Sequence, residues 1–212
     1  MIDYLIQYPD YIIVPFLEHI KITVITIAIS SLIAGLVSIL IMRSKILSNL
    51  VVGVFSAIYA VPSLALFAML IPFLGLGERT AIFVLIIYNQ YILVKNIIAG
   101  FQSINPAIIE AANGMGMSEL QSFFKIRLPL ASPIILAGMK VAVVSTIGIA
   151  TIAATINAGG LGTLLFDGLR TQNMVKIAWG TLLSSFLAVG ANYLLSLLER
   201  KVQRLTTENE RR

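Results

Sequence analysis

The sequence predicts an all-α integral membrane protein in which five transmembrane helices carry one long polar loop between the third and the fourth. Three observations lead to this fold class. Of the 212 residues, 58% are hydrophobic and 12% are charged, whereas about 25% of the residues in a soluble domain are charged. Five apolar segments are long enough to cross a bilayer as helices. The most apolar runs, such as residues 81–87, do not alternate with polar residues, which excludes transmembrane strands.

We place the five spans near residues 20–42, 50–72, 80–99, 132–156 and 175–198. Each segment has the roughly 20 residues that a helix needs to cross about 30 Å of hydrocarbon. With the loop at 100–130, the spans form a single transmembrane domain that covers residues 1–212.

The two ends of the chain flank this domain. Residues 1–19 mix tyrosines with acids and two prolines, which is typical of a segment that lies at the outer membrane interface. They carry neither a basic region nor an apolar core of the kind found in a signal peptide, so we expect the first span to act as an uncleaved anchor. Residues 199–212 form a charged tail whose basic side chains can hold the last span at anionic headgroups.

The distribution of Lys and Arg predicts the orientation. In the five-span arrangement, 10 of the 15 basic residues fall on one side, 4 fall on the other, and Lys140 falls within a span. By the positive-inside rule, the N-terminus lies outside and the C-terminus lies in the cytoplasm, together with the loop at 100–130. The net charge of +5 therefore reflects membrane orientation and not nucleic-acid binding. We expect Lys140 to reach toward the cytoplasmic headgroups, or instead to pair with Glu119 or Glu110.

Polar and helix-breaking residues at membrane depth are candidates for the lining or gate of a pathway. Pro62 removes a backbone hydrogen bond in the second span and kinks or unwinds the helix there. Such a kink can also serve packing alone, and buried amides and hydroxyls can join helices or bond their own backbone. The pathway candidates are Tyr59, Pro62, Ser63, Tyr88, Asn89, Ser145 and Thr151.

The residue types exclude several kinds of chemistry. With no cysteine and a single histidine, disulfides and thiolate sites are excluded and a metal site is not expected. The glycine-rich run 158–162 has neither the preceding strand nor the glycine spacing of a phosphate-binding loop. We expect it to let residues 163–169 fold back against the outer end of the bundle, as a cap or gate or as a plain connection.

The most informative segment is the polar block from residue 110 to residue 129. Pro106 predicts a helix start, Gly114 and Gly116 break that helix, and Ser118 is typical of the N-cap of a second short helix. A proline at position 129 is expected to end the second helix before the fourth span. The candidate coupling residues in this block are Glu110, Ala111, Ala112, Gly114, Gly116, Ile126, Leu128 and Pro129.

The spacing of these residues resembles the EAA loop of the permease subunits of bacterial ABC importers. In that family the loop engages a separate ATPase, so the resemblance implies that ATP and magnesium bind to the partner ATPase, that this chain holds no cofactor, and that it is not itself an enzyme. It also implies a second permease copy or a paralogue, an extracytoplasmic substrate-binding protein, and a place in the bacterial cytoplasmic membrane. No Walker-type loop occurs in the sequence.

Further residues are similar to the osmoprotectant branch of these permeases, which serves glycine betaine, carnitine and choline. They are Glu18, His19 and the runs 61–65, 75–77, 112–117, 158–162 and 199–201. The run 89–91 departs from the pattern, because a small, proline-containing stretch is expected there. Other betaine-like or zwitterionic substrates, including thiol-derived betaines, remain open.

Two other classes of protein are less compatible with the sequence. A stand-alone channel or secondary carrier predicts intramembrane acids or inverted repeats, and all ten carboxylates lie outside the spans or at their ends. A membrane enzyme requires a catalytic cluster, which the sequence lacks. The sequence therefore favours a transport subunit.

Overall fold

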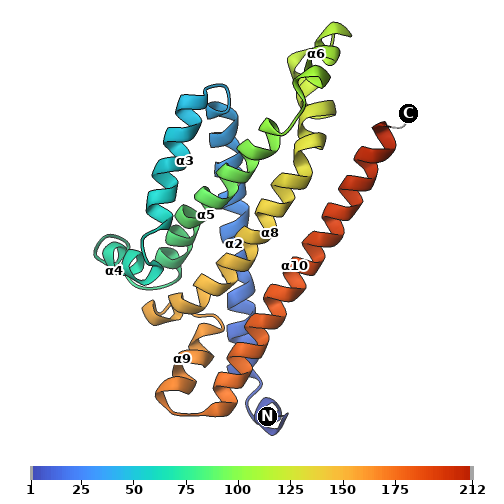
Figure 1. Ribbon diagram of the computed structural model, residues 1–212. Helices are drawn as coiled ribbons and strands as arrows, with labels where there is room; N and C mark the ends of the chain where they lie inside the picture. The colour runs from blue at the N-terminus through green and yellow to red at the C-terminus, as the bar shows by residue number, and fades with distance from the viewer. Residues whose placement is uncertain (1, 211–212) are drawn as a thin grey trace.

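The structure is a computed structural model that describes residues 2–210, with the side chains of residues 4 and 6–201. The described part is helical apart from short connections, and its long helices run along one axis (Figure 1). In chain order the elements are α1 (Ile2–Gln7), α2 (Asp10–Ile41), α3 (Lys45–Tyr59), α4 (Ser63–Leu74), α5 (Glu78–Gln102), α6 (Pro106–Gly114), α7 (Glu119–Ser122), a π-helical turn (Phe123–Arg127), α8 (Leu128–Ala153), a 3-10 turn (Ala154–Ile156), α9 (Gly162–Arg170) and α10 (Met174–Glu210).

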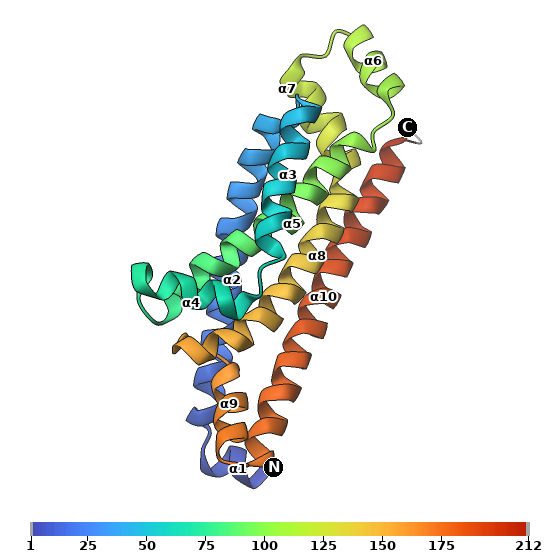
Figure 2. The same cartoon turned by 60° about the vertical axis from the view of Figure 1, so that its left-hand side comes forward.

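The helices account for the predicted spans. In the described part of the chain, four continuous helical segments are long and apolar enough to cross a membrane: Asp10–Ile41, Glu78–Gln102, Glu119–Ile156 and Met174–Lys201. The pair α3 and α4, which meet at an angle of 93°, makes a fifth span if the two helices cross the membrane together. A break in the second span is therefore present where Pro62 predicts one, and α4 projects sideways from the bundle (Figure 2).

The helix that carries the first span begins before the predicted span. Helix α2 starts at Asp10 and not near residue 20, so only α1 is separate from it. Pro15 lies inside α2, where it removes one backbone hydrogen bond without ending the helix.

Helix α5 lies at the centre of the bundle and packs against α2, α3, α4 and α8. In the most apolar stretch of α5, 61% of the residues are buried, whereas none of the residues in the corresponding stretch of α10 is buried. Helix α10 packs mainly on α8 and α9, so most of its surface is left for lipid or another chain. The largest buried cluster joins α2, α5 and α8 through residues that include Ala34, Leu93, Val94, Ile98 and Ala142.

The two ends of the bundle carry different elements. Helices α1 and α9 lie at one end, and α6 lies at the other with the end of α10 (Figures 1 and 2). We name the first the outer end and the second the inner end, following the orientation predicted from Lys and Arg.

The second short helix of the polar block does not end before the fourth span. Helix α7, the π-helical turn and α8 follow one another without interruption, so the prediction that Leu128 and Pro129 end the helix is wrong. Pro129 lacks an N–H, and the turn before it widens so that the Leu128 N–H donates to the Phe123 carbonyl, five residues back. The segment Glu119–Ile156 has 38 residues, which at 1.5 Å per residue makes a rod of about 57 Å.

Candidate functional site

The loop at the inner end is built by local capping. The Asn105 side chain accepts a hydrogen bond from the Ala107 N–H at 3.0 Å and so starts α6. Helix α6 ends at Gly114, and Gly116 follows in the left-handed region with φ 76°. Ser118 and Gln121 then form a capping box that starts α7, with side chain to backbone distances of 3.3 and 3.0 Å. A helix, a glycine turn and a second helix are present as the sequence predicts.

The candidate coupling residues differ in exposure. Glu110, Ala111, Gly114 and Gly116 are exposed, Ala112 is buried, and Ile126, Leu128 and Pro129 are half-buried. The two alanines in this set are small enough to permit close approach to another surface. Only Ala111 faces solvent, while Ala112 packs within the chain.

Three large apolar side chains on the loop are more than half exposed to solvent. Met115 and Leu120 are each 72% exposed, and Phe124 is 62% exposed. A group of apolar side chains on a polar, solvent-facing loop is typical of a protein interaction surface. None of the three is among the candidate coupling residues named from the sequence, and Met115 follows the last residue of α6.

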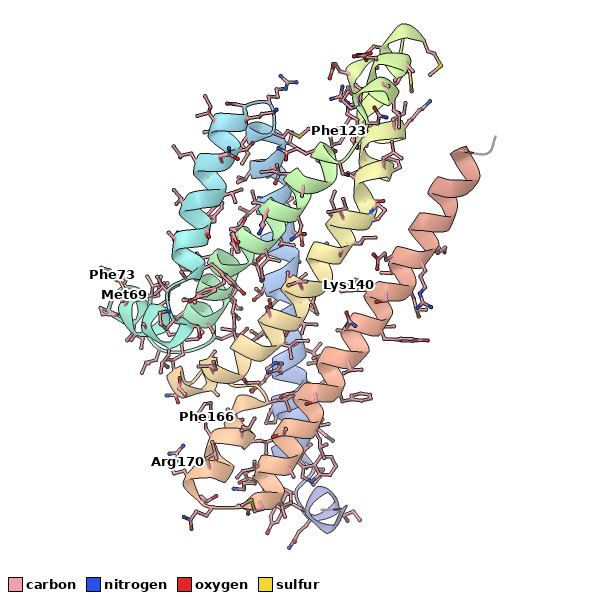
Figure 3. All side chains as sticks on the ribbon, viewed as in Figure 1. Met69, Phe73, Phe123, Lys140, Phe166 and Arg170 are labelled. Atoms are coloured by element: carbon pink, nitrogen blue, oxygen red, sulfur yellow. The ribbon has the colours of Figure 1, made fainter. Side chains whose placement is uncertain are left out.

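An aromatic contact joins this loop to the bundle. Phe101 in α5 stacks on Phe123 in the π-helical turn, with ring centroids 5.6 Å apart and planes inclined by 23°. Phe123 also meets Phe124 edge-on at 5.1 Å. Figure 3 shows Phe123 where the loop meets the inner end of the bundle. The contact ties the loop to the last turn of α5, and the π-helical turn continues directly into α8.

Four of the pathway candidates gather at the break between α3 and α4. The rings of Tyr59 and Tyr88 are 5.4 Å apart in an edge-on arrangement. The Tyr88 hydroxyl donates to the Val61 carbonyl, inside the break, where Pro62 and Ser63 also lie. A carbonyl freed at the broken helix thus finds a donor on α5.

Tyr91 belongs to the same group. Its ring lies 5.1 Å from that of Tyr59, and the Lys95 ammonium lies 5.3 Å from its centroid. Tyr91 is missing from the predicted site, although its spacing of three residues from Tyr88 on one helix places both on one face.

The other three pathway candidates lie elsewhere. Asn89 is 2% exposed and donates to the Thr146 hydroxyl at 2.8 Å, so it joins α5 to α8 in this conformation. Thr151 donates to the Gly148 carbonyl of its own helix at 2.6 Å. Ser145 lines a groove of about 600 Å³ between α8 and α10. None of these three is brought to the tyrosine group.

Lys140 has a partner that the sequence does not predict. Its ammonium lies 2.5 Å from the carboxylate of Glu199, with side chains 21% and 17% exposed. Figure 3 shows Lys140 on the side of α8 that faces α10. The expected pairing with Glu119 or Glu110 is therefore wrong, while the reach of Lys140 toward the cytoplasmic headgroups stays a prediction. The pairing arises because α10 runs along α8 and brings Glu199 to the level of Lys140.

At the outer end, the glycine-rich run leads into α9, which packs on α10. Lys176 of α10 donates a hydrogen bond to Asp167 of α9 at 2.5 Å. This bond holds the pKa of the Asp167 carboxyl below its ordinary value, and the charge of Lys176 acts in the same direction. The predicted fold-back of residues 163–169 is present as a helix.

Comparisons with known proteins identify the family. The family described as "Binding-protein-dependent transport system inner membrane component" matches residues 22–206. The glycine betaine/carnitine/choline transport system permease protein OpuCB of Bacillus subtilis (strain 168) is 33% identical over 185 residues, which cover 87% of this chain and 85% of the relative. The ergothioneine transport permease/ergothioneine binding protein EgtU of Helicobacter pylori (strain G27) is 38% identical over 154 residues, or 72% of this chain and 28% of the relative.

A solved structure supports the same assignment at the level of the fold. The inward-facing MetNI methionine ABC transporter contains a chain that superposes with a TM-score of 0.80 at 18% identity, covering 90% of this chain and 95% of that chain. The fold, the helical loop at the inner end and the sequence match over most of the length agree. This chain belongs to the family of binding-protein-dependent transport system inner membrane components.

Proposed function

We propose that the chain is the membrane-spanning permease subunit of an ATP-driven ABC importer for a small osmoprotectant or quaternary ammonium compound, such as glycine betaine, carnitine or choline. The observation that carries the proposal is the capped helical loop at the inner end, with exposed Met115, Leu120 and Phe124. Membership of the family and the substrate named for the Bacillus relative support the substrate class.

The partners follow from the same proposal. Two ATPase subunits, which hold ATP and magnesium, bind the loop residues around Glu110, while this chain holds no cofactor and catalyses no hydrolysis. A second copy of the chain or a paralogue completes the pathway. Helix α4 projects from the bundle and exposes Met69 by 64% and Phe73 by 82% (Figure 3), which is compatible with contact to another chain or to lipid. An extracytoplasmic binding protein delivers the substrate, and nucleic acid has no part.

The position of the protein is the bacterial cytoplasmic membrane, with the N-terminus outside and the C-terminus in the cytoplasm. In this orientation the capped loop reaches the side on which ATP is available. The excess of basic residues at the inner end supports the orientation.

Closure of the ATPase pair around the loop would move two spans together. The stacked rings of Phe101 and Phe123 connect the loop to α5, and the loop continues directly into α8. The tyrosine group at the α3–α4 break consists of Tyr59, Tyr88 and Tyr91, and the last two belong to α5. Movement of α5 therefore changes the surroundings of Tyr59. Tyr59, Tyr88, Pro62 and Ser63 are the pathway residues that this arrangement favours, because broken helices at membrane depth are typical of transport sites.

Tyrosine rings also suit the proposed substrates. A quaternary ammonium group is attracted to the face of an aromatic ring. A second candidate is a betaine-like zwitterion derived from a thiol compound, which the name of the Helicobacter relative favours. An ATP-independent channel or secondary carrier is the competing class.

Uptake into proteoliposomes tests the proposal. The chain is reconstituted with its ATPase and binding protein, and uptake of labelled glycine betaine, carnitine, choline and ergothioneine is measured with and without internal ATP. We expect ATP-dependent uptake of at least one compound, and its loss in Gly116→Asp. Asn113→Asp is the matched control, since it adds the same charge to the exposed loop at a residue without positive φ. Uptake that ignores ATP would favour the channel or carrier instead.

A further inference from the structure

The single histidine of the chain lies buried at the outer end of α2 and holds two distant segments. Its side chain is 0% exposed. His19 Nε2 donates to the Ile147 carbonyl of α8 at 3.2 Å, and Nδ1 accepts from the Leu161 N–H at 3.2 Å. Because a carbonyl can only accept and an N–H can only donate, these two partners fix a neutral ring with its proton on Nε2. One ring therefore connects α2, α8 and the start of α9.

The neighbouring carboxylate completes the contact. Glu18 Oε2 accepts a hydrogen bond from the Gly160 N–H at 2.9 Å. Glu18 and His19 thus bind two successive backbone N–H groups, of Gly160 and Leu161, which lie 142 residues further along the chain. A buried backbone N–H requires a partner, and here both partners are side chains of α2.

The glycines are shaped to these two side chains. Gly159 and Gly160 have φ of 81° and 78°, a region that residues with a side chain rarely adopt. A Cβ at Gly159 would lie 2.5 Å from Glu18 Oε2, and a Cβ at Gly160 would lie 2.9 Å from His19 Nδ1. Both conformation and close approach therefore require glycine at this contact.

The same contact sits at the far end of the rod that starts in the inner loop. The continuous helix Glu119–Ile156 begins beside the capping box and contains Ile147, whose carbonyl accepts from His19. The glycine segment follows its last turn. A shift of this continuous helix relative to α2 therefore changes the hydrogen bonds of His19 and Glu18, which lie between the helix and α9.

We propose that Glu18 and His19 form a latch that positions the glycine segment and α9 at the outer end, and that each transport cycle breaks and remakes it. The proposal rests on the proposed function as an ATP-driven importer. Glu18 and His19 are positioning residues, since they act on α9 through backbone hydrogen bonds. Outside the latch, α9 is held by the Asp167–Lys176 pair and by Leu161 and Leu164 against Ile12.

A reversible cross-link tests the latch. The chain has no cysteine, and a Cβ at Gly160 lies 3.5 Å from that of His19, within the roughly 3.5–4.5 Å that a disulfide spans. The double variant His19→Cys, Gly160→Cys is reconstituted with ATPase and binding protein, and uptake is measured after oxidation and again after reduction. We expect uptake by the oxidised double variant to be at least tenfold lower than uptake by the same variant after reduction. Each single cysteine variant, oxidised in the same way, controls for effects of the oxidant. Unchanged uptake with a complete cross-link would overturn the proposal.

A second variant covers the case in which the double variant does not assemble. Leu161→Cys places one thiol at a site that is 0% exposed. We expect a membrane-impermeant thiol reagent, added from outside, to react several-fold faster during ATP-driven transport than at rest. Equal rates would show that the segment stays in place, and the latch would then be a static contact. Wild-type protein without ATP-driven uptake would refute the proposed function, whereas normal wild-type uptake with equal labelling rates refutes only the latch.

Discussion

Gly116 offers a direct test of how the inner loop is built. Its φ of 76° lies in the left-handed region, and no heavy atom lies within 4 Å of a Cβ added there. Gly116→Ala therefore introduces backbone strain without a clash, at a cost of about 1–2 kcal/mol. Gly114 is equally open but has no positive φ and is the last residue of α6. Gly114→Ala is expected to stabilise that helix by roughly 0.5–1 kcal/mol.

The two substitutions thus have opposite signs although both add one methyl group to the same exposed turn. Hydrogen exchange of peptides covering residues 105–122 measures the difference, because the turn is closed by bonds from the Gly116 N–H to Asn113 and from the Met117 N–H to Ala112. A loss of 1–2 kcal/mol makes exchange about 5–30 times faster when opening is local. We expect that acceleration for Gly116→Ala and slower exchange for Gly114→Ala. Equal effects of the two variants would refute the assignment of the turn to the conformation of Gly116.

Two further outcomes follow from side-chain contacts. The Asn89 side chain donates to the Thr146 hydroxyl at 2.8 Å and so joins α5 to α8. In a double-mutant cycle of Asn89→Leu and Thr146→Val, the free energies of unfolding in detergent should show a coupling energy of about 0.6 kcal/mol and at most about 1.7 kcal/mol. Additive effects would argue against that bond. The pKa of Asp167 is lowered in the folded protein, so its pair with Lys176 stabilises the packing of α9 on α10 fully at pH values above the ordinary pKa of 3.8. This stabilisation is lost as the pH falls through the lowered pKa. Trp179, the single tryptophan, packs against the cluster of Ile12, Leu161 and Leu164, so its fluorescence emission should follow this loss. Asp167→Asn should abolish the pH transition. A transition that persists in the variant belongs to another group.

Features that depend on neighbouring residues in the chain could be predicted from the sequence. The caps at Asn105 and Ser118 are read from residues within a few positions of each helix start, and both are present. The spans are set by apolar length, which is also local. Pro62 predicts a break, but the angle of 93° also reflects packing of α4 and Tyr88 across the break, which is not a local property.

Features that depend on which helices adjoin could not be predicted. Lys140 pairs with Glu199 because α10 runs alongside α8 in space, and the sequence spacing between the two residues carries no sign of this. Pro129 failed as a terminator because a π-helical turn absorbs its missing N–H, a geometry that competes with termination in the same sequence pattern. His19 is the single histidine of the chain, and its partners lie 128 and 142 residues away.

The fourth span is continuous with the inner loop, so one helix connects the inner end of the molecule to the outer end. If a loop and a span were separated by a hinge, movement of the loop would be lost in the hinge. Here the loop continues into α8, and the softest part of the connection is the π-helical turn, whose ring Phe123 is held by Phe101 of α5. The stacked rings limit bending of the turn, so a push on the loop is delivered along α8 toward the carbonyl of Ile147. The latch at Glu18 and His19 joins that helix end and the glycine segment to α2, and it consists of three hydrogen bonds. The two bonds of His19 each contribute a net of about 1 kcal/mol and the bond to the Glu18 carboxylate about 1.5–3 kcal/mol, so the proposed latch is a contact of a few kcal/mol that a transport cycle can break and remake.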